Sequence, residues 1–391
     1  MRADRDTDIV VVGGGPVGLG AAIEARLAGF DVVLVEPRAH ADGIEKACGE
    51  GLMPPGVAAL SRLGVDVEGV PFRGIRYVAA RVGRPDAVAE APFRAGPGLG
   101  ARRGVLSAAL AARAQEVGVV RVVGSVGPGD RLDGAAGVPA GSEVAGVRAS
   151  WVLAADGLHS PIRHRLGLHV DAEAARGVLG TARWHRGRPG TGDGRRYGLR
   201  RHYAVEPWTD LVEVHWGCDA EAYLTPVGPR LVGLAVLGPR GLGADDWWQR
   251  FPRLAERLAG ATPVTPLRGA GPMRQKASRR VAGSVLLVGD AAGYVDALTG
   301  EGISLGLACA REAVACLVAG RPQDYEAAWW RVTRRYRLLT GALLAAARRP
   351  VLRRTIVPVA GAVPGLFGAI VNGLGTDAGT ARGHEIRATA P

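Results

Sequence analysis

Three glycines near the start of the chain have the spacing of a dinucleotide-binding turn. They follow the apolar run 9–12 and precede a segment, 19–28, with helical spacing of small and apolar residues. In such a strand–turn–helix unit the glycines make a tight turn, let the backbone approach a pyrophosphate and allow the helix to pack on the strand. Amides at the helix start then meet the phosphates. The candidate residues of this turn are Gly13, Gly15, Pro16, Val17 and Gly18.

A carboxylate stands at the end of the next expected strand, which covers residues 31–36. Glu36 follows Gly18 by 18 residues. A carboxylate at this place accepts hydrogen bonds from a ribose diol and repels a 2′-phosphate. The sequence therefore predicts that the turn binds the adenosine diphosphate part of FAD or NAD. The neighbouring Pro37 and Arg38 are candidate contacts of the same group.

A second motif, about three quarters of the way along the chain, favours FAD over NAD. The buried-strand pattern 284–288 ends in Gly289 and Asp290, and a helix is expected to begin near residue 302. A carboxylate at a strand end can hold the ribityl hydroxyls of a flavin, and the following helix start can face its pyrophosphate or ring oxygen. The candidates at that helix start are Gly300, Glu301, Gly302 and Ile303.

Together these motifs resemble the FAD-binding domain of the para-hydroxybenzoate-hydroxylase-like flavoproteins, the group A flavoprotein monooxygenase superfamily. Asp156 and Gly157 begin a segment similar to the family's D-G…S…R motif, and Arg103 begins one similar to R-x-x-L-x-x-x-L, whose arginine approaches the flavin. The resemblance spans residues 8–318. It implies an α/β fold: a Rossmann-like FAD-binding domain with a βαβ start and a parallel sheet, an inserted antiparallel-sheet substrate lobe, and C-terminal helices.

Within this superfamily the chain resembles the geranylgeranyl-reductase-like branch. Residues 46–52 are similar to that branch's C-G-G-G-[IL] segment, and residues 296–303 to its P-x-T-G-G-G-I segment. Glu50 and Glu301 each replace a glycine, and Ala297 stands where proline is usual. Because of these departures, we carry over the flavin fold but not the prenyl-reductase activity.

The same resemblance places Cys48, Gly49 and Glu50 near the isoalloxazine ring. Cys48 and Glu50 are therefore candidate catalytic groups that tune or protonate at the ring, and Cys48 and Gly49 are also candidate cofactor contacts. The alternative is a small buried cysteine and a loop acid. His215, on an expected strand of the second lobe, is a third catalytic candidate that could face the substrate, although a structural role is favoured.

Composition and patterning suggest a chain that alternates between two lobes. The segments 211–216 and 230–237 alternate like half-buried antiparallel strands. The expected division is residues 1–75, 101–171 and 276–325 for the FAD-binding domain, 76–100 and 172–275 for the substrate lobe, and 326–391 for a C-terminal helical region.

Charge and cysteine content exclude several classes of protein. The 391 residues carry a formal charge of +12, almost entirely from scattered arginines without a nucleic-acid-reading motif, so a nucleic-acid partner is not expected. Four cysteines and eight histidines form no metal-ligand pattern, so no metal site is expected. Reduced cysteines and the lack of an apolar run of ~20 residues predict a cytoplasmic chain. The oligomeric state is left open.

The C-terminal region combines arginines with an apolar segment. Arg348, Arg349, Arg353 and Arg354 precede the apolar residues 355–371. Such a pattern could lie on a membrane surface with its arginines at lipid phosphates. The favoured alternative is a terminal helix pair that closes the core.

The resemblance implies an FAD-dependent oxidoreductase, and three functions remain open. The first is a monooxygenase in which NADH or NADPH reduces FAD, O2 forms a flavin C4a-hydroperoxide, and an apolar aromatic or polyketide-like small molecule is hydroxylated. The second is a geranylgeranyl-reductase-like reduction of isoprenoid double bonds at a membrane surface. The third is a flavin-binding redox module without turnover. Halogenation is disfavoured because the W-x-W-x-I-P motif of flavin halogenases has no counterpart.

Overall fold

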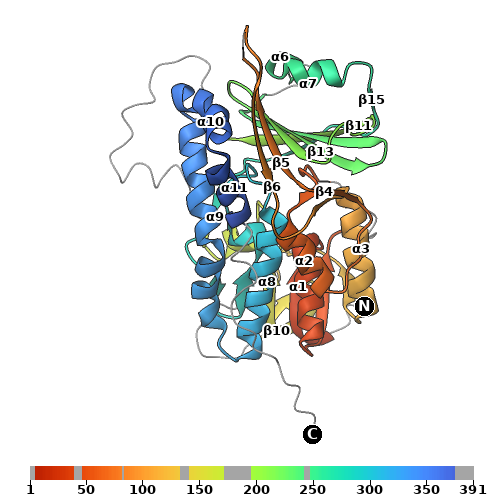
Figure 1. Cartoon of the computed structure of the whole chain (residues 1–391). Coiled ribbons are helices and arrows are strands. Elements are labelled where there is room, and N and C mark those ends of the chain that lie inside the picture. Colours follow the sequence, from red (N-terminus) through yellow and green to blue (C-terminus); the bar gives the residue numbers. More distant parts are fainter. Residues whose placement is uncertain are drawn as a thin grey trace, which may run out of the picture.

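The computed structural model describes residues 5–38, 46–81, 83–132, 141–170, 195–241 and 247–374. Figure 1 shows two sheet-based parts, with the C-terminal helices running along the side of both. Residues 171–194, 242–246 and the other intervening segments lie outside the described residues.

A mainly parallel sheet forms the first part. Its strand order is β18-β19-β10-β1-β2-β8, with β9 paired to β10. The strands β19, β10, β1, β2 and β8 run parallel, whereas β9 and β18 are antiparallel additions. Their bounds are β1 Arg5–Val12, β2 Val32–Glu36, β8 Val120–Val123, β9 Ser142–Val144, β10 Val147–Ala154, β18 Val281–Ala282 and β19 Val285–Leu287.

Helices cover this sheet and bury its valine-rich strands on both faces. The strand β2 is buried along its whole length, which explains why its sequence is a run of apolar residues rather than an alternation. The helix α1 packs between α3 and α8 and also contacts the sheet. The expected Rossmann-like FAD-binding fold is confirmed. The helices of this part are α1 Pro16–Leu27, α2 Pro54–Arg62, α3 Arg103–Glu116, α4 Pro161–Arg165 and α8 Gly302–Val318.

A second sheet forms the other part, in the order β15-β11-β14-β13-β12-β5-β6, with β16 paired to β11. The sequence predicts an antiparallel sheet, and all of these pairs are antiparallel except β5 with β12, which run parallel. The sheet joins segments from both sides of residues 101–171. The bounds are β5 Gly74–Ala79, β6 Ala87–Pro92, β11 Tyr197–Ala204, β12 Val212–Trp216, β13 Glu221–Gly228, β14 Leu231–Gly238, β15 Thr262–Pro263 and β16 Arg268–Ala270.

Short elements connect the two parts. A small sheet in the order β3-β7-β4 and a ribbon of β17 with β20 lie near the junction, and two short helices pack on the second sheet. The bounds are β3 Gly51–Leu52, β4 Val70–Phe72, β7 Gly98–Gly100, β17 Gln275–Lys276, β20 Gly293–Tyr294, α6 Trp247–Arg250, α7 Pro252–Arg257, and the 3-10 helices η1 Gly289–Ala292 and η2 Pro322–Asp324.

The C-terminal helices α9 (Tyr325–Ala347), α10 (Pro350–Ala362) and α11 (Pro364–Leu374) bridge both parts. Helix α9 packs on α8, and α10 and α11 pack on β6 of the second sheet (Figure 1). Among the described residues no single helix is long and apolar enough to cross a membrane, and α10 with α11 passes that test only as a pair bent by 101°.

One C-terminal arginine agrees with the favoured expectation, in which the terminal helices close the core, and not with the membrane-surface alternative. Arg353 is buried, and its guanidinium donates to the carbonyls of Gly217 (2.7 Å) and Ala220 (2.7 Å) and to Glu221 Oε1 (2.5 Å). It therefore fixes α10 to the second sheet and is not available to a lipid phosphate. Its neighbours Arg349 and Arg354 are exposed.

Candidate functional site

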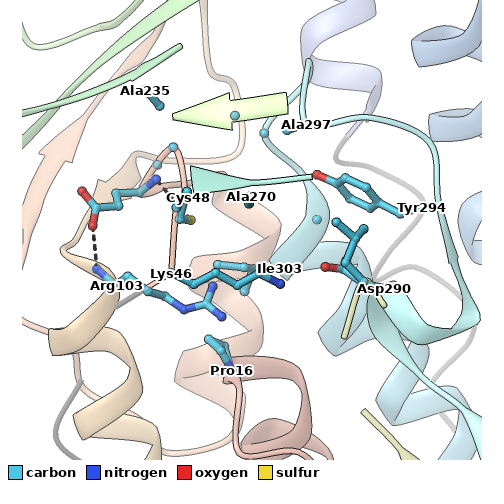
Figure 2. Close-up of a pocket in the computed structure, with 18 of the residues that line it drawn as sticks. Pro16, Lys46, Cys48, Arg103, Ala235, Ala270, Asp290, Tyr294, Ala297 and Ile303 are labelled. Carbon is cyan, nitrogen blue, oxygen red and sulfur yellow. Dashed lines mark hydrogen bonds between the residues drawn. The ribbon is translucent and has the colours of Figure 1, made fainter. Parts of the chain in front are cut away.

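A cavity of about 410 Å³ lies where the two sheets and the C-terminal helices meet. The glycine turn, the loop 46–53 and the segment 288–303 line one part of it, and strands of the second sheet line the rest. In Figure 2, Lys46, Cys48 and Arg103 gather above Pro16, whereas Asp290 and Tyr294 lie on the opposite side. The cavity therefore joins motifs that are far apart in the sequence.

The glycine turn leaves backbone exposed to this cavity. Gly13 has φ of 104°, and a Cβ on Gly18 would lie 1.8 Å from the Gly13 carbonyl oxygen, so the turn needs glycine at both positions. A Cβ on Gly15 would meet only the Arg103 guanidinium, at 3.8 Å. The backbone at Gly15 is thus open toward the cavity at the start of α1, which is the cradle a pyrophosphate requires.

Glu36 stands beside this cradle at the end of β2. Its buried carboxylate accepts a hydrogen bond from the Gly14 amide at 2.7 Å and pairs with Arg38 Nη1 at 3.3 Å. Glu36 and Arg38 both line the cavity, whereas Pro37 is exposed and does not. A carboxylate held in this position fits the ribose hydroxyls of an adenosine nucleotide.

The second motif meets the first directly. A Cβ on Gly289 would lie 3.0 Å from a Val17 methyl group, so the turn after β19 packs against the start of α1. Asp290 lines the cavity from this turn. Arg163, which is fully buried, holds the turn by donating to the Ala291 carbonyl oxygen at 3.0 Å. The two motifs therefore surround one ligand space.

The segment similar to D-G…S…R supports the same space. Asp156 and Gly157 line the cavity, and Asp156 Oδ2 accepts a hydrogen bond from the Ile162 amide at 3.0 Å. Burial raises the pKa of Asp156 above its ordinary value. Ser160 caps α4 by accepting from the Arg163 amide at 2.9 Å, which places Arg163 beneath the Gly289 turn.

The loop after β2 brings Cys48, Gly49 and Glu50 to the cavity wall, as the resemblance implies. The Glu50 amide lies 3.4 Å from Cys48 Sγ, and Thr225 Oγ1 on β13 donates to the Gly49 carbonyl oxygen at 2.8 Å. Lys46 also lines the cavity, although the motifs gave no reason to select it. The loop therefore connects the cofactor motifs to the second sheet.

The part of the cavity that faces the second sheet is apolar. Tyr223 donates its hydroxyl hydrogen to the Leu298 carbonyl oxygen at 2.8 Å, and burial raises the pKa of Tyr223 well above its ordinary value, so the phenol stays neutral. The wall reaches as far as α11. Its apolar residues include Tyr77, Val212, Val214, Leu237, Met273, Leu298 and Val371.

His215 is not among the residues that line the cavity. Its strand neighbours Val212 and Val214 face the cavity, and the alternation of β12 sends His215 to the other face. There His215 Nε2 lies 3.1 Å from Glu213 Oε2. Burial alone would raise the pKa of Glu213, but hydrogen bonds from His215, Arg76 and Trp208 lower it to about 2. His215 therefore has a structural partner in Glu213, and its position needs no contact with a substrate to explain it.

Glu301 is also turned away from the cavity, whereas Gly300, Gly302 and Ile303 line it. Its side chain is buried, and burial raises its pKa to about 8 despite the opposing charge of Arg335. In the folded chain this carboxyl keeps its proton up to about pH 8, whereas in the unfolded chain it loses its proton near pH 4.5. Between these two pH values the unfolded chain binds fewer protons than the folded chain, so the free energy of unfolding falls as pH rises.

We expect the free energy of unfolding to fall by a few kcal/mol as pH rises from about 5 to about 9 because of Glu301. Glu301→Gln keeps the shape but cannot ionise, so its excess stability over the wild type should be near zero at the acid end and largest at the alkaline end. Urea unfolding at several pH values measures this. Glu116→Gln, at an exposed position, is the control, and equal pH slopes for the wild type and Glu301→Gln would contradict the assignment.

Comparison with known proteins agrees with this geometry. No family model matches the chain. The chain is 30% identical over 360 residues to the menaquinone reductase of Mycolicibacterium smegmatis, covering 82% of this chain and 79% of that protein. It is 29% identical to digeranylgeranylglycerophospholipid reductase 2 of Methanopyrus kandleri, covering 78% and 75%. The chain belongs to the geranylgeranyl-reductase-like FAD-dependent oxidoreductases.

Solved structures share the fold of this geranylgeranyl-reductase-like protein. A triple mutant of the flavin-dependent brominase Bmp2 has a TM-score of 0.72 at 18% identity, covering 94% of both chains. Halogenase PltM in complex with phloroglucinol and FAD has a TM-score of 0.68 at 15% identity, covering 95% of this chain and 83% of that one. At these identities the likeness shows the fold and not the reaction. The fold and the cradle both fit FAD.

In this FAD-dependent oxidoreductase most of the predicted cofactor contacts line the cavity and two do not. The structure brings all of them to the cavity wall except Pro37 and Glu301. Reasoning from sequence missed Lys46, the apolar wall from the second sheet, and Val371 of α11. Of these residues, only Val212 and Val214 had a signal in the sequence: the alternation of their strand predicts that both side chains lie on the same face.

Proposed function

We propose that this chain reduces carbon–carbon double bonds of an isoprenoid lipid, with NADH or NADPH as the reductant of FAD. The observation that supports this best is the lining of the cavity, which joins the FAD cradle and Cys48 to apolar side chains of the second sheet and to Val371 of α11. The reductase names of the relatives, one of which specifies a geranylgeranylated phospholipid, agree with an apolar chain as substrate.

When bound, FAD supplies hydride transfer to and from carbon. The residues of the chain position the cofactor and exclude water. The apolar wall favours an alkyl or isoprenoid chain over a polar molecule because each buried methylene contributes about 0.8 kcal/mol. Cys48, on the wall between the cradle and this space, is the thiol best placed to approach the substrate. In this proposal the reduced double bond lies between the cradle and the apolar wall.

An anaerobic assay separates the three functions. Holoenzyme reduced by NADH or NADPH is mixed with a short-chain menaquinone or with a geranylgeranylated glycerophospholipid in micelles, and the product mass is measured. We expect a gain of two hydrogens without oxygen. Reaction only in the presence of O2, with an oxygen atom added to the product, would instead support a hydroxylase. No substrate-stimulated oxidation of NADH or NADPH under either condition would support a redox module without turnover.

We also propose that α10 and α11 contact a lipid bilayer. Nearly half of the exposed large apolar side chains of the described residues lie on this pair or at Val363 between its helices, near the exposed Arg349 and Arg354. Apolar side chains beside arginines suit the surface of an anionic membrane. Because Val371 of α11 also lines the cavity, a lipid could enter from that surface. The exposed apolar residues are Val351, Leu352, Val359, Val363, Leu366 and Ile370.

Leu366→Ser is expected to weaken binding to anionic vesicles by about tenfold or more, because it removes one inserted apolar side chain. Leu338→Ser is the matched control, since Leu338 is exposed to a similar extent on α9. Co-sedimentation with phosphatidylglycerol vesicles measures the effect. Equal losses in the two variants, or no binding by the wild type, would refute the membrane contact.

A further inference from the structure

The Glu50 side chain points from the cavity wall into the second sheet. Glu50 is among the residues that line the cavity, but its side chain has no exposed surface. Its Oε2 lies 2.6 Å from Nε2 of His202 on β11, and its Oε1 accepts a hydrogen bond from the Arg103 amide at 2.9 Å. Because this amide is at the start of α3, the helix dipole also stabilises the negative charge. The carboxylate therefore links the loop 46–53 to α3 and to the second sheet.

Backbone strain and a neighbouring glycine accompany this buried carboxylate. Glu50 has φ of 59°, in the left-handed region that disfavours residues with a side chain. A Cβ on Gly233 of β14 would lie 2.9 Å from Glu50 Oε2, so a side chain there would displace the carboxylate. Backbone strain that persists in a folded protein is concentrated at functional sites. The strain therefore indicates a functional role for Glu50, although both carboxylate oxygens are occupied inside the protein.

Both hydrogen-bonding partners of the carboxylate are donors. Arg200 Nη1 lies 3.0 Å from His202 Nδ1, and a guanidinium can only donate, so Nδ1 accepts. The ring proton is then on Nε2, where it is donated to Glu50. Arg200 Nε also lies 3.8 Å from Glu50 Oε1, which brings a buried positive charge beside the negative one. A carboxylate meets two donors with two oxygens, whereas a carboxamide has only one acceptor oxygen.

The same loop has further attachments next to Cys48. Thr225 Oγ1 on β13 donates to the Gly49 carbonyl oxygen at 2.8 Å, and the Glu50 carbonyl oxygen accepts from the Ala101 amide at 2.9 Å. The Glu50 amide lies 3.4 Å from Cys48 Sγ. The two residues after Cys48 are thus held by the second sheet and by the segment before α3, while Cys48 itself lines the cavity.

We infer that Glu50 is a positioning residue that fixes the Cys48 thiol against the bound substrate. Glu50, His202 and Arg200, which we call the Glu50 clamp, hold the loop 46–53 on the sheet that supplies the apolar wall of the cavity. The clamp acts through the position of Cys48 and transfers no proton. This inference rests on the proposed function, in which the double bond lies beside Cys48. A displacement of about 1 Å at a reacting centre can slow a reaction about 100-fold.

Two substitutions release the clamp in different ways. Glu50→Gly removes the carboxylate and also the strain, because glycine adopts φ of 59° freely, so this variant should fold. Glu50→Gln keeps the size of the side chain but leaves one of the two donors without an acceptor. With a short-chain menaquinone as substrate and no oxygen, both should lower kcat on the order of 10- to 100-fold and change KM little. Stopped-flow reduction of FAD by NADPH, measured without the menaquinone, should be unchanged.

Alkylation of Cys48 reports the position of the loop without any substrate. In holoenzyme saturated with FAD, iodoacetamide should label Cys48 several-fold faster in both variants than in the wild type, and label the exposed Cys218 at an unchanged rate. Peptide mass spectrometry measures both rates.

Glu213→Gln is the matched control. Glu213 is also a buried glutamate beside a histidine of the second sheet, with Oε2 3.1 Å from His215 Nε2, but it lies on the face away from the cavity. This variant should lower stability without changing kcat or the labelling of Cys48.

A double-variant cycle shows whether Glu50 acts through Cys48. Substitutions of residues that act as one unit have non-additive effects. In a Cys48→Ala background, Glu50→Gly should therefore lower kcat no further.

A merely structural contact predicts a different pattern. It would make Glu50→Gly and Glu213→Gln alike in kcat and in Cys48 labelling, or it would make the effects of Glu50→Gly and Cys48→Ala additive. Either result, or slower reduction of FAD by NADPH in Glu50→Gly, would overturn the positioning role. A wild-type enzyme that cannot reduce the menaquinone would contradict the proposed function instead, and the labelling of Cys48 would still test the clamp.

Discussion

Gly18→Ala protein is expected to purify without FAD and to unfold at a lower temperature than the wild type. The new Cβ would lie 1.8 Å from the Gly13 carbonyl oxygen and 3.1 Å from the Ala155 side chain. Neither the Gly13 carbonyl nor β10 beneath it can move away without opening the turn that carries the phosphate-facing amides. Because this turn is the cradle itself, the loss of FAD should be nearly complete.

FAD content is measured from the absorption spectrum, and stability from thermal unfolding. Gly127→Ala is the control, because a Cβ at Gly127 meets nothing within 4 Å and Gly127 is not among the residues that line the cavity. It should retain the FAD content and the melting temperature of the wild type. A Gly18→Ala variant with full FAD content would mean that the turn does not hold the cofactor.

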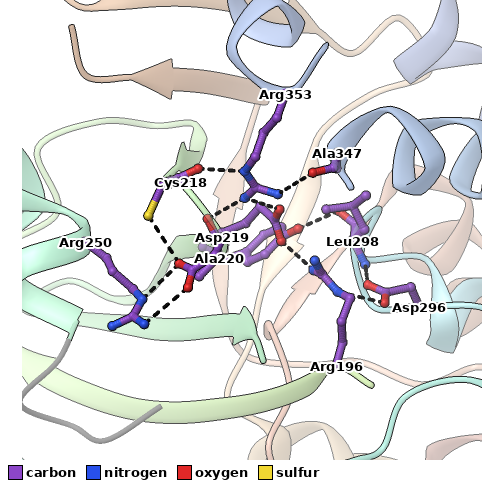
Figure 3. A network of polar contacts seen from close by, with 12 residues as sticks. Arg196, Cys218, Asp219, Ala220, Arg250, Asp296, Leu298, Ala347 and Arg353 are labelled. Carbon is purple, nitrogen blue, oxygen red and sulfur yellow. Dashed lines mark hydrogen bonds and ion pairs between the residues drawn. The ribbon is translucent and has the colours of Figure 1, made fainter. Parts of the chain in front are cut away.

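Arg353→Met is expected to lower the free energy of unfolding by about 3–5 kcal/mol, the range found when one partner of a buried ion pair is removed. Figure 3 shows the network in which Arg353 lies. Glu221 is shared by Arg353 and Arg196, and Arg196 also pairs with Asp296 at 3.0 Å. Removal of Arg353 takes away the hydrogen bonds that it donates to the Gly217 and Ala220 carbonyls and to Glu221, and weakens the attachment of α10 to the sheet.

The neighbouring Arg354 provides a close control. It is exposed on the same helix, so Arg354→Met should change the free energy of unfolding by no more than about 0.5 kcal/mol. Chemical denaturation of both holoproteins measures the difference. Similar values for the two variants would contradict the role of Arg353. A loss of vesicle binding in Arg354→Met, with its stability unchanged, would in turn support the membrane contact.

Local sequence signals were sufficient where one segment carries its own chemistry. The glycine turn, Glu36 at the end of β2 and Asp290 after β19 each combine a strand end with a residue type that the ligand needs, and the structure places them around one cavity. The helices α1 and α8 were likewise expected close to where the structure has them. In these segments the pattern and the function depend on residues within a few positions of each other.

Long-range pairing could not be predicted in the same way. Glu50 and His202 are 152 residues apart, and nothing in either segment indicates the other. The parallel pairing of β5 with β12 and the burial of Arg353 also depend on how distant elements pack. A phosphate contact for Arg353 remained open as the less favoured alternative because sequence shows its charge but not its partner Glu221. Glu301 was predicted to contact the cofactor with its neighbours Gly300 and Gly302, but it does not line the cavity. Successive residues at a helix start point in different directions, and the motif alone does not show which of them face the ligand.

The central claim is that the two glycine-containing turns hold one FAD between them. Titration of FAD into deflavinated protein, followed by flavin fluorescence, tests it most directly. The account predicts saturable binding of one FAD per chain that is lost in both Gly18→Ala and Asp290→Ala and kept in Gly127→Ala. A chain that takes up no FAD, or that binds it equally well in all three variants, would contradict it.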